Sequence, residues 1–161
     1  MKTNTSNEQI ARELLDKIGQ KKKELSQLKK KYNDAFNAIV ESWKEDVNNQ
    51  FPKLKPCDIE EYVGVDLVLK RKVYNIFIAE DKQKLYCMFS LDRKDKTNYD
   101  QNIREVMDKA DFEKLKTVFN RYLNENKAVA YENAQGFYIK FKMGQFDAAY
   151  DFFMRVVRAF V

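Results

Sequence analysis

The 161-residue chain contains no histidine, only four glycines and only two cysteines. Without histidine, imidazole bases, Ser-His-Asp and Cys-His nucleophile systems and most zinc or iron ligand sets are excluded. No GxGxxG or GxxxxGK[ST] sequence occurs, and no acidic loop has EF-hand spacing, so neither a phosphate-cradling loop nor a calcium loop is expected. We therefore predict no cofactor and no metal site, apart from Mg²⁺ under a nuclease alternative considered below.

The two cysteines, Cys57 and Cys87, lack the CxxC spacing of a metal or redox site. Free thiols in a chain with no recognisable secretory signal fit a reducing cytosol. The longest uncharged apolar runs, residues 73–79 and 85–91, are far shorter than the roughly 20 residues of a membrane-spanning helix. We therefore expect a small, soluble, cytoplasmic protein that does not cross a membrane.

The N-terminal third of the chain has the apolar period of a helix. Apolar residues recur at steps of three, four and seven from Ile10 to Val47, and Ser6 with Gln9 resembles a capping box. Pro52 and Pro56 end the pattern because proline restricts the preceding residue and has no amide donor. The sequence predicts a long amphipathic helix over residues 1–51, with a possible kink at Gly19.

An unbroken helix of this length would exceed the diameter of a compact body of this size. Taken from Asn7 to Phe51, it would be about 67 Å long at 1.5 Å per residue, against a diameter of roughly 40 Å for the body. Either the helix breaks near Gly19, or one of its ends projects. We expect its second half, which contains Trp43 and Phe51, to dock on the body.

Residues 52–161 are predicted to form an α+β body, within one structural domain overall. Three stretches with strand character, over residues 63–69, 73–79 and 85–91, indicate an antiparallel meander that is apolar on both faces and covered on both. Two helices follow, the second with Asp111 as N-cap, and then a second β-hairpin and a C-terminal helix. In the last strand, Phe137, Ile139 and Phe141 are expected to face the core and Tyr138, Lys140 and Lys142 to face water, unlike an RNA-binding RNP1 strand.

Residues 17–31 carry seven lysines and one acidic residue, Glu24. The lysines could contact phosphates, or they could form a solvated helix face. The apolar residues between them approximate a heptad that runs to Ile39, with Lys21 at one core position. This pattern fits either a partner-binding helix or an ordinary amphipathic helix that folds back. The predicted partner-binding residues are Lys17, Lys21, Lys22, Lys23, Leu25, Leu28, Lys29, Lys30, Lys31 and Tyr32.

One catalytic alternative rests on Asp66 in a predicted strand, followed by Glu80 and Lys82 in a Glu-x-Lys sequence. This spacing, with the element order, resembles the PD-(D/E)XK nuclease superfamily. The resemblance implies that Asp66 and Glu80 hold a divalent ion such as Mg²⁺ and that Lys82 orients the attacking water. The competing interpretation, which we favour, is a solvated charged turn.

The sequence therefore predicts a non-enzymatic interaction protein of the adaptor or inhibitor type. It would act on a macromolecular partner, either another protein or a second copy of itself, through the basic amphipathic N-terminal helix. The alternatives are a reduced metal-dependent nuclease and a protein that binds nucleic acid without cleaving it.

Overall fold

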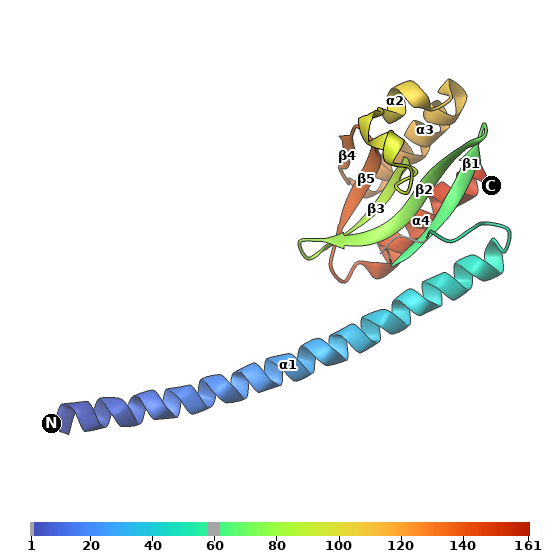
Figure 1. The fold of residues 1–161 in the computed structure, drawn as a ribbon. Helices are drawn as coiled ribbons and strands as arrows, with labels where there is room; N and C mark the ends of the chain where they lie inside the picture. Colours follow the sequence, from blue (N-terminus) through green and yellow to red (C-terminus); the bar gives the residue numbers. More distant parts are fainter. Residues whose placement is uncertain (1, 58–61) are drawn as a thin grey trace. The chain divides into compact units, whose positions relative to one another are not determined.

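A computed structural model describes residues 2–57 and 62–161, with side chains from residue 6 onward (Figure 1). The fold is α+β, as predicted. Its elements are α1 (Lys2–Gln50), β1 (Val63–Leu69), β2 (Lys72–Asp81), β3 (Lys84–Leu91), the 3₁₀ helix η1 (Lys96–Asp100), α2 (Ile103–Val106), α3 (Lys109–Asn126), β4 (Ala130–Asn133), β5 (Gly136–Lys142) and α4 (Phe146–Phe160). The chain divides into two compact units, Met1–Ser42 and Trp43–Val161, so α1 contributes to both.

The helix α1 is continuous over 49 residues. It runs through Gly19 without interruption, so the break considered from the sequence does not occur (Figure 1). It also begins before Ser6, and the predicted capping box is therefore wrong as a helix start. In the last backbone hydrogen bond of the helix, the Phe51 amide donates to the Val47 carbonyl oxygen at 2.8 Å, immediately before Pro52, which confirms the predicted stop.

Replacing Gly19 by alanine is expected to stabilise α1 locally by about 1 kcal/mol, because alanine is the better helix former. A methyl group at this position would meet no atom within 4 Å, so no steric cost opposes the gain. Hydrogen–deuterium exchange of the amides around residue 19 should slow severalfold. Ser26→Ala, also on the exposed helix, is the matched control and should give a smaller gain. Faster exchange in Gly19→Ala would contradict the prediction.

The five strands form one antiparallel sheet in the order β1-β2-β3-β5-β4. The predicted meander is therefore joined to the second hairpin through the pairing of β3 with β5, which places Met88 opposite Tyr138. Two-residue turns connect β1 to β2 and β2 to β3. Their central residues are Lys70, Arg71, Lys82 and Gln83, all with φ between 48° and 66°, as type I′ hairpin turns require.

One face of the sheet packs against α3 and α4 and holds the main core. Phe137, Ile139 and Phe141 of β5 are buried on this face, which confirms their predicted direction. Phe152 of α4 lies at the centre, and its ring centroid is 4.7 Å from that of Tyr122 and 5.0 Å from that of Phe119. The N-cap of α3 is Asp108 rather than the predicted Asp111, because the Asp108 carboxylate accepts from the amides of residues 110 and 111.

The last turns of α1 pack on α4, as expected for the second half of the helix. Trp43 is buried and stacks on Tyr150 with ring centroids 5.5 Å apart. The Tyr150 hydroxyl donates to the Asp46 carboxylate, which also accepts from Gln50 at 2.9 Å. These hydrogen bonds hold the pKa of Asp46 below its usual value, and burial together with the same carboxylate raises the pKa of Tyr150. The contact therefore combines apolar packing with a charge-assisted hydrogen bond.

The second face of the sheet carries a smaller apolar cluster. Phe77, Ala79 and Met88 are buried there, and Tyr86 and Tyr138 pack against them while staying partly exposed. The guanidinium of Arg93 lies 4.8 Å from the centre of the Phe77 ring. The prediction of two covered faces is therefore confirmed on the helix side. On this side Phe77, Ala79 and Met88 are covered, whereas the two tyrosines are only partly covered. The reason is that tyrosine can bury its ring against the sheet while its hydroxyl group meets water.

Candidate functional site

The predicted partner-binding surface lies on α1, in the unit that precedes Trp43. Every described side chain over residues 6–35 is exposed. The large apolar ones are roughly half exposed, with Leu14 at 52%, Ile18 at 49%, Leu25 at 51% and Leu28 at 61%. Tyr32 stacks on Phe36 one turn later, with ring centroids 5.9 Å apart. Contiguous exposed apolar surface of this kind is typical of an interaction site.

The large exposed apolar residues of α1 follow a heptad register, apart from Ile10 and Leu15, which lie beside it. Written as abcdefg, the a positions hold Ala11, Ile18, Leu25, Tyr32 and Ile39, and the d positions hold Leu14, Lys21, Leu28 and Ala35. We call these nine residues the heptad seam. Because α1 is a single helix from Lys2 to Gln50, the whole seam lies on one continuous element. An a/d seam over four heptads is the pattern of a helix that pairs with another helix.

The lysines lie close to the heptad seam. Lys17 and Lys31 occupy g positions and Lys22 and Lys29 occupy e positions, directly beside it, whereas Lys23 and Lys30 lie at f on the far side. Lys21 pairs with Glu24 at 3.5 Å. Over the described residues, the other six lysines of the segment make no ion pair. Their charges are therefore not neutralised by the side chains that the structure describes.

The structure does not bring the three residues of the nuclease alternative together. Asp66 lies opposite Asn75 in the β1–β2 pairing, and Glu80 follows Asn75 by five residues on β2. This spacing corresponds to about 17 Å along the strand and to opposite faces of the sheet. Lys82 lies in the turn beyond the strand. Among the described residues, no group of three side chains from the Asp, Glu, Cys and His types could hold a metal ion.

Asp66 has structural partners instead. Its carboxylate accepts a hydrogen bond from Asn75 Nδ2 at 2.8 Å and lies 3.4 Å from Cys57 Sγ. Asn75 in turn accepts from the backbone amide of Arg93 at 2.8 Å. Burial, followed by the nearby Asp66 charge, raises the pKa of Cys57, so this thiol is not an activated nucleophile. The group therefore satisfies buried polar atoms across two strands and a loop.

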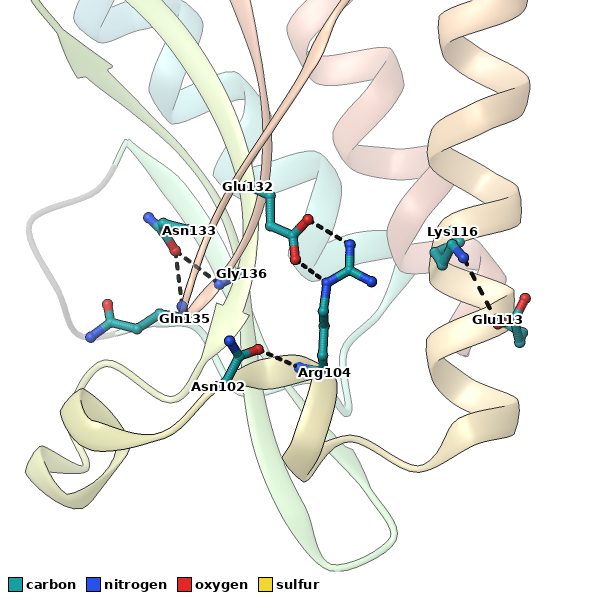
Figure 2. Close-up of polar contacts among 8 residues, drawn as sticks. All are labelled: Asn102, Arg104, Glu113, Lys116, Glu132, Asn133, Gln135 and Gly136. Atoms are coloured by element: carbon teal, nitrogen blue, oxygen red, sulfur yellow. Dashed lines mark hydrogen bonds and ion pairs between the residues drawn. The ribbon is translucent and has the colours of Figure 1, made fainter.

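A second polar cluster, around Arg104, is also structural (Figure 2). Arg104 and Glu132 form a bidentate ion pair, in which Nη2 lies 2.6 Å from Oε2. The hydrogen bonding from Arg104 lowers the pKa of Glu132. Asn133 accepts from the amides of Gln135 and Gly136, each at 3.0 Å, and so closes the β4–β5 turn. The pair joins α2 to β4, and both of its side chains stay partly exposed.

Sequence reasoning missed a group of tyrosines on the partly open face of the sheet. Tyr131 and Tyr138 stack with ring centroids 5.3 Å apart, and the Tyr86 ring lies edge-on to Tyr138 at 6.1 Å. Lys140 Nζ lies 5.1 Å from the centre of the Tyr131 ring. Tyr86, Tyr138 and Lys140 also line a pocket of about 270 Å³. The β4–β5 hairpin is local and could have shown that Tyr131 lies opposite Tyr138, whereas Tyr86 joins them only through the β3–β5 pairing.

Comparisons of the chain with protein-family models, with curated proteins and with solved structures found no match. Among the described residues, no helix combines the length and the hydrophobicity needed to cross a bilayer. The heptad seam with its flanking lysines is the candidate site.

Proposed function

We propose that this chain is a non-enzymatic interaction protein that engages a macromolecular partner through the heptad seam of α1. The observation that carries the proposal is the half-exposed row of Leu14, Ile18, Leu25 and Leu28 on one uninterrupted helix. Burying a large aliphatic side chain completely contributes roughly 1.5–3 kcal/mol, so covering this row is a substantial driving force. The geometry of Asp66 and Glu80, which lie on opposite faces of the sheet, offers no comparable support for catalysis.

The proposal is tested by placing charge on the seam. The double substitution Leu25→Glu with Leu28→Glu should abolish association, because two carboxylates would have to be buried between helices. Ser26→Glu with Gln27→Glu is the matched control: it adds the same charge in the same turn, at the b and c positions away from the seam. The control variant should associate like the unsubstituted protein. Circular dichroism should show that both variants keep their helix.

Association is measured in two ways on the full chain. Sedimentation velocity gives the mass of the purified protein, and affinity purification from the cells of origin identifies what co-purifies with it. We expect either a mass above that of the monomer or one defined partner, lost only in the seam variant. A strict monomer that co-purifies with nothing would overturn the proposal. Mg²⁺-dependent cleavage of nucleic acid that disappears in Asp66→Ala would replace it with the nuclease alternative.

A further inference from the structure

The charges beside the heptad seam restrict what can cover it. In a pair of helices, the e and g residues of one helix lie against those of the other and decide which partners are compatible. Over residues 17–31 these flanking positions hold Lys17, Lys22, Lys29 and Lys31, with Glu24 as the one acidic residue. The d position between them holds Lys21 in place of an apolar residue. The surface that a partner helix must meet is therefore apolar along its centre and positive along both edges.

A second copy of this chain fits that surface poorly. In a parallel pair, Lys21 would face Lys21 of the other copy inside the seam, where two ammonium groups would be partly desolvated. Lys17 would also lie against Lys22 of the other copy, and only Glu24 with Lys29 would attract. In an antiparallel pair, e positions meet e positions and g positions meet g positions. A register that brings Lys22 against Lys29 also brings Glu24 against Lys31, and it leaves Lys17 and Lys21 without an acidic partner. Like charges in such positions destabilise helix pairing.

A nucleic acid also fits less well than a helix. Phosphates that contacted the lysines would leave Leu25 and Leu28 in water, about half exposed as they are now. A polyanion would be attracted to every lysine of the segment. A helix in the seam would instead contact the lysines at the e and g positions and would not contact Lys23 and Lys30 at f. The apolar row together with its positive edges therefore favours a protein helix.

We propose that the occupant of the heptad seam is an amphipathic helix of a different protein, with acidic residues flanking its own apolar seam and an acidic residue facing Lys21. This inference rests on the proposed function and names the class of partner for the same surface. The residues from Ile10 to Ala35 span about 39 Å of helix at 1.5 Å per residue, which accommodates a partner of nearly four heptads. Opposite charges along both edges would also speed the encounter of the two helices.

The test uses the full-length protein and two fluorescent peptides of four heptads each. Both peptides carry leucine at d and isoleucine at a, and they differ only in having glutamate or lysine at every e and g position. Binding is followed by fluorescence anisotropy at low and at physiological salt. Because single surface charge contacts are weak, we expect their sum to favour the acidic peptide by about tenfold at low salt. The preference should shrink as salt rises.

Two double variants of the full chain separate edge recognition from general charge attraction. Lys22→Glu with Lys29→Glu changes the e positions and should reverse the preference toward the basic peptide. Lys23→Glu with Lys30→Glu makes the same charge change at the f positions and should keep the preference for the acidic peptide. Leu25→Glu with Leu28→Glu should bind neither peptide. Equal losses in the e and f variants, or equal affinity for the two peptides, would overturn the inference.

Other outcomes distinguish this inference from the proposed function. A stable dimer that neither peptide displaces would make a second copy the occupant, which overturns the inference and keeps the proposed function. Salt-sensitive binding of a single-stranded oligonucleotide that survives Leu25→Glu with Leu28→Glu would assign the lysines to phosphate, and it would overturn both. A monomer that binds neither peptide and co-purifies with nothing would also overturn both.

Discussion

Alanine at position 136 is expected to lower the free energy of unfolding by about 3 kcal/mol, at the upper end of overpacking effects. A Cβ atom on Gly136 would lie 2.0 Å from the carbonyl oxygen of Phe89 and 2.8 Å from the Cα of Ser90. Both atoms belong to the backbone of β3, so no side-chain rotation can relieve the overlap. The β3–β5 pairing, which joins the meander to the second hairpin, must open at this point.

The control for Gly136→Ala is a second glycine-to-alanine substitution that is not expected to destabilise the protein. Urea unfolding monitored by tryptophan fluorescence reports on the unit that contains both Trp43 and the sheet. Gly19→Ala is the same chemical change in an open site of α1, and it should leave this transition unchanged or strengthen it. A Gly136→Ala protein as stable as the unsubstituted one would mean that β3 and β5 do not approach as described. If the Gly136→Ala protein does not fold, it will show no cooperative unfolding transition, and that result also agrees with the predicted loss of stability.

Phe152→Ala is expected to be as damaging, with a loss of about 3–5 kcal/mol, the range for large aromatic side chains removed from a core. Phe152 is fully buried on α4. Its ring meets Phe119 and Tyr122 of α3 and Phe141 of β5, so its removal leaves a cavity where two helices and the sheet converge. Rings held on three sides cannot collapse freely into the space, which keeps the cost high.

Phe152→Leu serves as the graded control, because leucine keeps most of the apolar volume. It should cost clearly less than Phe152→Ala in the same urea titration. The two variants should leave peptide binding by α1 intact at temperatures where they are folded, since the heptad seam lies in the other unit. Equal losses for leucine and alanine would indicate that the site is sensitive to ring geometry rather than to volume.

Much of the fold could be predicted because local patterns in this chain agree with its tertiary structure. The expected strand over residues 63–69 matches β1, Val63–Leu69, and the expected strand over 85–91 lies within β3, Lys84–Leu91. The predicted helix start at Ser6 was wrong because residues that resemble a capping box can also occur inside a helix. The N-cap prediction at Asp111 was wrong because the Asp108 carboxylate accepts from the first amides of α3, a geometry that the sequence does not show.

Long-range features were harder to predict. The joining of five strands into one sheet depends on the β3–β5 register, which places Cys87 opposite Ile139, and no local pattern encodes that pairing. The tyrosines of the partly open face follow from the same register, since Tyr86 and Tyr138 lie on adjacent strands. The heptad seam, in contrast, is local to one helix, so its residues could be found from the sequence. What covers them stays a prediction.

The exposure of residues 6–35 has a thermodynamic consequence for any partner. A helical segment with no buried side chain depends on intrinsic propensity and on contacts along its own helix, such as that of Lys21 with Glu24, rather than on tertiary packing. While it is unoccupied, this segment should therefore open locally more readily than the packed helices α3 and α4, and part of the attraction on contact would offset the entropy of ordering it. Binding that includes this ordering cost would be readily reversible. The fraction of the protein in the bound state would therefore follow the concentration of the partner.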